Sequence, residues 1–174
     1  MAQTRRMISL YLMRHGPADA PGEDPPLTDV GERLIEDAAR GMARLGLHFD
    51  DIFSSPLQRA ARTAELVAAT AGRADARLGQ RWAVLSEAGP GAHLSAIASR
   101  LAERRARGRI LVVGHQPDMG RMAMEAIGAH QPLPFDRGTL CGVESLSWEE
   151  LAAGKPGTLR LLVPAAALAL IAHV

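Results

Sequence analysis

The segment LYLMRHGPAD (residues 10–19) changes abruptly from apolar residues to an arginine, a histidine and a glycine. The run MISLYLM (residues 7–13) carries no charge and predicts a short buried strand. A cation and an imidazole directly after a buried strand indicate either an ordinary turn or the edge of a site. The junctions that follow the other strands decide between these two interpretations.

The composition is that of a globular protein, with 47% hydrophobic and 22% charged residues among 174. This length suits a single domain spanning residues 1–174. The net charge of +1 gives no general attraction to nucleic acid or to an anionic membrane, so neither is expected as a partner. The one cysteine, Cys141, excludes a disulfide within the chain. No signal peptide is recognisable, and we expect a cytoplasmic protein.

Strand-like and helix-like segments alternate along the chain. After the first strand, a loop over residues 17–26 leads to a helix that we expect to begin behind the N-cap Thr28 and to end at Gly46. Residues 71–91 are expected to be mostly loop. This alternation predicts a three-layer α/β/α sandwich with a mostly parallel central sheet. The remaining predicted elements are strands over residues 50–55, 109–115, 139–148 and 158–163, and helices from the cap Ser55 to about residue 70, over 94–105 and over 119–127.

Three strand-to-helix junctions carry polar residues of the same kind. The carboxyl ends of parallel strands meet at one edge of a sheet, and ligands bind at this edge in open α/β folds. Two arginines, two histidines and a helix N-terminus at one edge would suit a small dianion, most simply phosphate. The residues are Arg14 and His15 after the first strand, Arg59 shortly after the second, and Gly114 and His115 after the third.

Each of these residues, taken alone, has an ordinary explanation. A histidine at a strand end is usually structural, and an arginine is usually a surface charge. A metal site built from His15 and His115 is a further alternative. It fits poorly, because the adjacent arginines repel a cation and no carboxylate or cysteine cluster lies beside either histidine. The repetition of the same chemistry at three junctions favours a phosphate site.

Four motifs, in this order along the chain, resemble those of the histidine phosphatase superfamily, which shares its fold with cofactor-dependent phosphoglycerate mutases. The chain is short and leaves little room for an added cap domain. In this respect, and in the sequences DPPLT (24–28) and GHQPDMG (114–120), it resembles the small SixA-type branch of phosphohistidine phosphatases. The four motifs are LMRHG (12–16), PLTDVG (26–31), SSPLQRAARTAE (54–65) and VVGHQP (112–117).

The resemblance implies a metal-independent phosphatase without a cofactor, in which His15 is the nucleophile and becomes phosphorylated. Arg14, Arg59 and His115 would bind the phosphoryl oxygens, with Gly16 beside them. We expect the two arginines to lower the pKa of His15, and a backbone carbonyl near Gly16 to hold its second ring nitrogen. Larger relatives have a carboxylate as general acid before the second histidine. The candidate here is Glu87, which fits equally well as a surface residue of a loop.

The substrate that the resemblance favours is phosphohistidine on a signalling protein, such as a histidine phosphotransfer domain. Imidazole needs a proton on leaving far less than an alkoxide does, so P–N cleavage suits a site whose general acid is undecided. Two alternatives stay open. One is a small-molecule phosphomonoesterase of the same superfamily, acting on a small phosphate ester with Glu87 as the acid. The other is a phosphate-binding module without catalytic activity.

Overall fold

The computed structural model describes residues 7–19, 22–85 and 93–174. Within these residues, six strands form one sheet in the order β3-β2-β4-β1-β5-β6. β5 runs antiparallel to both of its neighbours, and the other pairs are parallel, so the sheet is mostly parallel as predicted. The strands are β1 (Ile8–Arg14), β2 (Phe49–Ser54), β3 (Gly72–Arg81), β4 (Arg109–Gly114), β5 (Leu140–Ser145) and β6 (Thr158–Val163).

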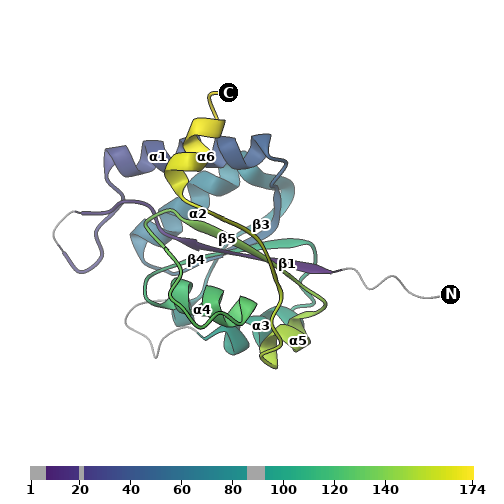
Figure 1. Ribbon diagram of the computed structural model, residues 1–174. Helices are drawn as coiled ribbons and strands as arrows, with labels where there is room; N and C mark the ends of the chain where they lie inside the picture. The colour runs from purple at the N-terminus through teal and green to yellow at the C-terminus, as the bar shows by residue number, and fades with distance from the viewer. Residues whose placement is uncertain (1–6, 20–21, 86–92) are drawn as a thin grey trace.

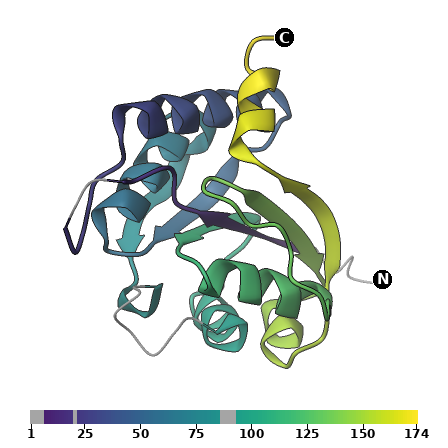
Figure 2. The same ribbon diagram turned by 60° about the vertical axis from the view of Figure 1, so that its left-hand side comes forward.

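Helices cover both faces of this sheet, which confirms the three-layer α/β/α arrangement (Figure 1). The turned view of Figure 2 shows the same two helical layers with the sheet between them. One layer consists of α1 (Asp29–Arg44), α2 (Gln58–Ala71) and α6 (Ala165–Ile171). The other consists of α3 (Leu94–Glu103), α4 (Asp118–Ile127) and α5 (Trp148–Ala152).

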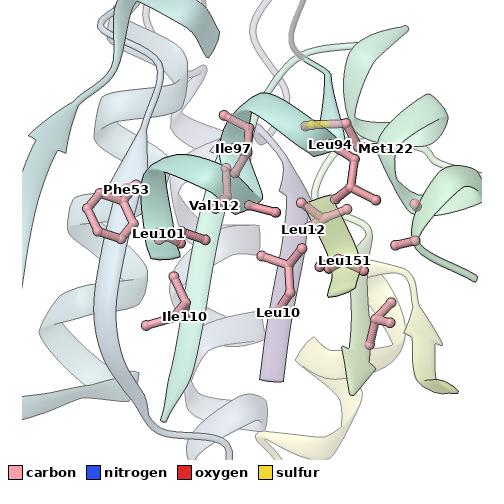
Figure 3. Packing of buried hydrophobic residues seen from close by; sticks show 14 of the residues in the cluster. Leu10, Leu12, Phe53, Leu94, Ile97, Leu101, Ile110, Val112, Met122 and Leu151 are labelled. Atoms are coloured by element: carbon pink, nitrogen blue, oxygen red, sulfur yellow. The ribbon is translucent and has the colours of Figure 1, made fainter. Parts of the chain in front are cut away.

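The central strands supply side chains to a hydrophobic core on each face of the sheet. In β1, Leu10 and Leu12 join the core under α3, α4 and α5, whereas Tyr11 and Met13 join the core under α1, α2 and α6. This alternation follows from the two-residue period of a strand. Because both faces are covered, the central strands read as continuous apolar runs. Figure 3 shows the first of these cores, with Leu10 and Leu12 near Ile110 and Val112 of β4 and near side chains of α3.

The start of α1 agrees with the sequence prediction. Thr28 is the N-cap, and its Oγ1 accepts a hydrogen bond of 3.0 Å from the backbone N–H of Gly31. Asp29 and Glu32 lie in the first turn, where the helix dipole favours negative charge. The chain leaves the helix through Gly46, whose positive φ of 69° is a conformation that glycine adopts without strain.

Two predicted boundaries were wrong. The helix expected to begin at Pro56, directly after the cap Ser55, begins two residues later, at Gln58. Ser55 Oγ instead accepts a bond of 3.2 Å from the N–H of Leu57 within a turn. The backbone of Leu57 is extended, with φ −65° and ψ 139°, so Leu57 takes the cap position and Gln58 is the first helical residue. The strand expected to run to Trp148 ends at Ser145, and Ser147 caps the short helix α5.

Two further elements were not predicted. β3 occupies residues that we expected to be loop, and it pairs with β2 in an irregular register. β3 lies at an edge of the sheet, and its sequence, GRADARLGQR, has no apolar alternation that would have predicted a strand. α6 packs against α1 and follows β6 directly. Its alanine-rich sequence has no capping side chain that would have marked its start.

The packing of α6 on α1 predicts the effect of one substitution. A Cβ atom at Gly41 would overlap the backbone carbonyl oxygen of Leu168. Alanine is intrinsically better than glycine in a helix by about 1 kcal/mol, yet a backbone atom cannot turn aside as a side chain can. We expect Gly41→Ala to lower the free energy of unfolding by about 1–3 kcal/mol, measured by urea denaturation.

The matched control is Arg40→Ala, next to Gly41 on the same helix. The Arg40 side chain is 51% exposed and pairs with the nearby Asp37, so its loss should change stability by less than about 0.5 kcal/mol. A Gly41→Ala protein as stable as the control would contradict the close approach of the two helices.

Candidate active site

The three junctions that carry the polar residues lie side by side at one edge of the sheet. Arg14 is the register partner of Gly114 across β1 and β4, and Ser54 is the partner of Val113 across β2 and β4. The backbone N–H of His15 donates to the carbonyl of Gly114 at 3.0 Å, so the pairing continues past the strand end. The sheet therefore brings the two histidine-bearing junctions together, as the sequence predicted.

His15 and His115 face one another across this edge. Their ring centroids are 5.1 Å apart, with an angle of 54° between the ring planes. Both side chains are buried, at 5% and 2% exposure. This separation leaves the two imidazoles close enough to contact the same small group.

One hydrogen bond determines which nitrogen of His15 is available for chemistry. Nδ1 lies 2.7 Å from the backbone carbonyl oxygen of Gly16. A carbonyl can only accept, so Nδ1 must carry the proton in this contact. In the neutral ring, Nε2 then keeps its lone pair and can act as a nucleophile. A backbone carbonyl at Gly16 was the partner expected from the sequence.

The pKa of His15 is lowered from 6.5 to about 4. Burial of the ring is the largest cause, and the neighbouring charges of His115, Arg59 and Arg14 lower the pKa further. The hydrogen bond to Gly16 acts in the opposite direction. The predicted direction is confirmed, but the predicted cause was incomplete, because burial contributes more than the arginines. His15 is therefore uncharged at neutral pH.

Two arginines reach this edge from different elements. Arg14, at the end of β1, donates from Nη1 to the carbonyl of Phe135 at 3.3 Å. Arg59 lies in the first turn of α2 and is only 6% exposed. Its Nη1 is 3.4 Å from Oδ1 of Asp24. Both guanidinium groups are near enough to the uncharged His15 ring to lower its pKa, and such a pair of cations is suited to an anion such as phosphate.

Asp24 is a residue of this site that sequence reasoning missed. Besides contacting Arg59, its Oδ1 accepts a bond of 2.8 Å from the N–H of Gln58, the first residue of α2. The Gln58 side chain donates back to the Asp24 carbonyl at 3.2 Å. Asp24 thus caps α2 from a separate loop. The sequence marks Asp24 only as part of the DPPLT motif, and nothing in the motif reveals a contact 34 positions away.

Arg62, one helical turn after Arg59, is held elsewhere. It donates to both carboxylate oxygens of Glu32 in α1, at 2.7 and 3.1 Å. The hydrogen bond from Arg62 lowers the pKa of Glu32. A second carboxylate, that of Glu65, lies 3.6 Å from Arg62 Nη1. Arg62 thus links α1 to α2.

Gly16 fills a place where no side chain fits. A Cβ atom there would lie 2.6 Å from Cγ1 of Ile35. Its backbone N–H, the one donor that it could offer to a phosphate, donates instead to Oγ1 of Thr63 at 3.0 Å. Gly16 therefore contacts His15 through its carbonyl, and its N–H is bonded to α2.

The remaining predictions concern the general acid, metals and membranes. Glu87, the predicted acid, lies outside the described residues.

Within residues 7–19, 22–85 and 93–174, no group of three or more histidine, cysteine or acidic side chains is placed to hold a metal ion. In that same part of the chain, no helix has the length and apolar character needed to cross a bilayer.

The low pKa of His15 predicts a loss of stability in acid. As the pH falls from 6.5 toward about 4, the unfolded chain binds a proton at His15 that the folded protein does not. His15 therefore does not lower the free energy of unfolding above pH 6.5, and it lowers this free energy progressively as the pH falls to about 4. We expect urea denaturation across this range to show a steeper decline for the wild type than for His15→Gln. The Glu32–Arg62 pair is present in both proteins, so its own acid sensitivity cancels, and equal slopes would contradict the assignment.

Comparison with known proteins places the chain in a family. The model of the histidine phosphatase superfamily (branch 1) matches residues 10–88. An uncharacterized protein from a Picosynechococcus strain is 39% identical over 131 residues, which cover 71% of this chain and 75% of that protein.

Solved structures share the fold. The protein histidine phosphatase SixA, solved with tungstate, superposes with a TM-score of 0.74 at 21% identity, covering 92% of this chain and 99% of SixA. A phosphoglycerate mutase from Bacillus anthracis superposes with a TM-score of 0.68 at 15% identity, covering 97% of this chain and 98% of the mutase. An alpha-ribazole phosphatase from Shigella flexneri superposes with a TM-score of 0.65 at 19% identity, covering 91% of this chain and 98% of that phosphatase. With its phosphoglycerate mutase-like fold and these sequence matches, the chain belongs to the histidine phosphatase superfamily.

Proposed function

We propose that this protein is a phosphatase that acts through a phosphohistidine intermediate at His15 and removes phosphate from phosphohistidine on a signalling protein. The observation that carries the proposal is the state of His15. Its ring is buried and uncharged at neutral pH, and the Nδ1 proton points to the Gly16 carbonyl. Nε2 is thereby left as the atom that can attack phosphorus.

In the first step, Nε2 of His15 forms a bond to phosphorus while the bond from phosphorus to the substrate imidazole breaks. The electron pair of the broken bond stays on the imidazole nitrogen, and the ring leaves neutral because its other nitrogen carries a proton. The His15 ring keeps its Nδ1 proton and becomes positively charged, which strengthens the hydrogen bond to Gly16. Arg14, Arg59 and His115 contact the equatorial oxygens of the phosphoryl group. Their contribution is largest during transfer, when negative charge is spread over those oxygens.

In the second step, a water molecule attacks the phosphorus, and the bond to Nε2 breaks. The product leaves as dihydrogen phosphate, which keeps both protons of the water. The electron pair of that bond returns to Nε2, so His15 is again neutral with its proton on Nδ1. The positive charge that phosphoryl transfer requires comes from the side chains of Arg14 and Arg59. In this cycle, the protein supplies both the nucleophile and the positive charge that stabilises the transferred phosphoryl group.

The choice of substrate rests on two supports. The first is the similarity of the fold to SixA, which binds tungstate, a tetrahedral oxyanion like phosphate, in its solved structure. The second is leaving-group chemistry. Imidazole leaves from phosphohistidine as a much weaker base than an alkoxide, so cleavage depends less on a general acid. The role of Glu87 as that acid stays a prediction.

The test compares rates on a phosphorylated histidine phosphotransfer domain with rates on a panel of alkyl phosphates. We expect faster turnover of the phosphorylated domain and its loss in His15→Ala. Wild-type enzyme quenched during turnover should carry acid-labile phosphate on His15. Glu87→Gln should leave phosphohistidine cleavage nearly unchanged.

Other outcomes would redirect the assignment. Fast hydrolysis of an alkyl phosphate that falls by about 10²–10⁴ in Glu87→Gln would favour a small-molecule phosphomonoesterase. Binding of phosphate without turnover of any substrate, including an aryl phosphate that needs little acid assistance, would indicate a binding module.

The different surroundings of two neighbouring arginines give a further prediction. Arg59 is buried beside His15, whereas Arg62 is held by Glu32 and Glu65. We expect Arg59→Ala to lower the rate by about a hundredfold or more, because it removes charge from the phosphoryl site. Arg62→Ala should lower thermal stability slightly and leave the rate within about threefold of wild type, since an exposed ion pair contributes about 1 kcal/mol or less. Similar losses of rate in both variants would contradict this placement of the helix.

A further inference from the structure

The side chain of Thr63 is fully buried between α2 and the loop after β1. Its Oγ1 donates to the carbonyl of Arg59, one turn earlier in the helix, at 2.7 Å. The same oxygen accepts a bond of 3.0 Å from the N–H of Gly16. A hydroxyl has one proton to donate and lone pairs to accept, so both bonds form together. Valine, which has the same shape, could form neither.

These contacts connect the two sides of the phosphate site. On one side, Thr63 is anchored to the residue that supplies the Arg59 guanidinium. On the other side, it holds Gly16, whose carbonyl accepts the Nδ1 proton of His15 at 2.7 Å. Glycine has more backbone freedom than any other residue, so the direction of its carbonyl depends on what fixes its neighbouring groups. The N–H of Gly16 bonds to Thr63 at 3.0 Å, and two backbone bonds hold the residues on either side, from the N–H of Gly138 to the His15 carbonyl and from the N–H of Thr28 to the Pro17 carbonyl. Of these three bonds, the one to Thr63 is supplied by a side chain, so it is the one that a substitution can remove.

We propose that Thr63 is a positioning residue, which fixes the ring of His15 relative to Arg59 so that Nε2 and the guanidinium converge on the same phosphoryl group. This inference rests on the proposed function, in which His15 is the nucleophile. Thr63 is too deeply buried to contact the substrate itself. It acts through Gly16 on the histidine and through the helix backbone on the arginine.

The effect should be greater in the transition state than in the bound substrate. When Nε2 bonds to phosphorus, the ring gains positive charge, and the bond from Nδ1 to the Gly16 carbonyl becomes charge-assisted. A carbonyl that has shifted therefore stabilises the transition state less, while the binding of the substrate changes little. Interactions of this type alter kcat more than KM. A misplacement of about 1 Å in the reacting groups can cost about a hundredfold in rate.

The kinetic test uses Thr63→Val, which keeps the shape and removes the hydroxyl. Thr63→Ser, which restores the hydroxyl, is the rescue variant. Thr70→Val, at an exposed position of the same helix, is the matched control. With an aryl phosphate as substrate, we expect kcat of Thr63→Val to fall by about 10- to 100-fold with KM within about threefold. Thr63→Ser should come within a few-fold of wild type, and Thr70→Val should equal it.

A second measurement does not depend on turnover. Nitrogen-15 NMR of the imidazole groups in the substrate-free protein reports which ring nitrogen of His15 carries the proton. Wild type, Thr63→Ser and Thr70→Val should show the Nδ1–H form. Thr63→Val should show a mixture of both forms, because the Gly16 carbonyl loses the side-chain bond that helps to hold it in place. If no protein, wild type included, turns over any phosphate, the proposed function fails, and the proton position alone still decides the positioning role.

Three results would overturn the inference. One is wild-type kcat and a wild-type proton position in Thr63→Val. Another is a loss of activity that only matches the loss of folded protein, as measured by circular dichroism. The third is a Thr63→Ser variant as impaired as Thr63→Val. Should Thr63→Val fail to fold, Thr63→Cys replaces it, because a thiol of similar size is a weak donor and a weak acceptor.

Discussion

The parallel pairing of β1 with β4 is the constraint on which the site depends. With Arg14 opposite Gly114, the residues that follow the two strands, His15 and His115, must emerge next to each other. A shift of this register by one residue would move the apolar side chains of β1 to the opposite face of the sheet. Because both faces are packed with buried residues, such a shift is strongly disfavoured. The hydrophobic core thereby fixes the distance between the histidines.

The proposed function places two opposing electrostatic demands on this site. A receptor for phosphate needs positive charge, whereas a histidine nucleophile must stay unprotonated. Burial meets both demands at once. It lowers the pKa of His15 by disfavouring its charged form, and it strengthens the attraction between the arginines and an anion by excluding water. The Gly16 carbonyl opposes the pKa shift but directs the remaining proton to Nδ1.

The position of α2 shows how separate loops complete such a site. The helix has no capping side chain of its own next to its first residue. Asp24 caps it from the loop before α1, and Thr63 bonds it to the loop after β1. Arg62 further ties it to α1 through Glu32. Arg59 is thus carried by a helix that three contacts hold in place, which limits the movement of its guanidinium.

The sequence by itself determined the central strands, the start of α1 and the location of four candidate site residues at strand-to-helix junctions, namely Arg14, His15, Arg59 and His115. These features depend on local signals, namely apolar runs, a threonine cap and short motifs. Each signal lies in residues that are adjacent in the chain, so it can be recognised without the structure. The predicted direction of the His15 pKa shift also followed from neighbours in the motifs.

Only the tertiary structure decided the features that depend on residues far apart in the chain. The capping of α2 by Asp24 and the bridge from Thr63 to Gly16 join positions 34 and 47 residues apart. The edge strand β3 forms because β2 offers it hydrogen-bonding partners, although its own sequence has no strand periodicity. Burial, the main cause of the low pKa of His15, comes from the packing of the sheet and helices around it. Local sequence cannot specify such contacts, because each joins segments that come together only in the folded chain.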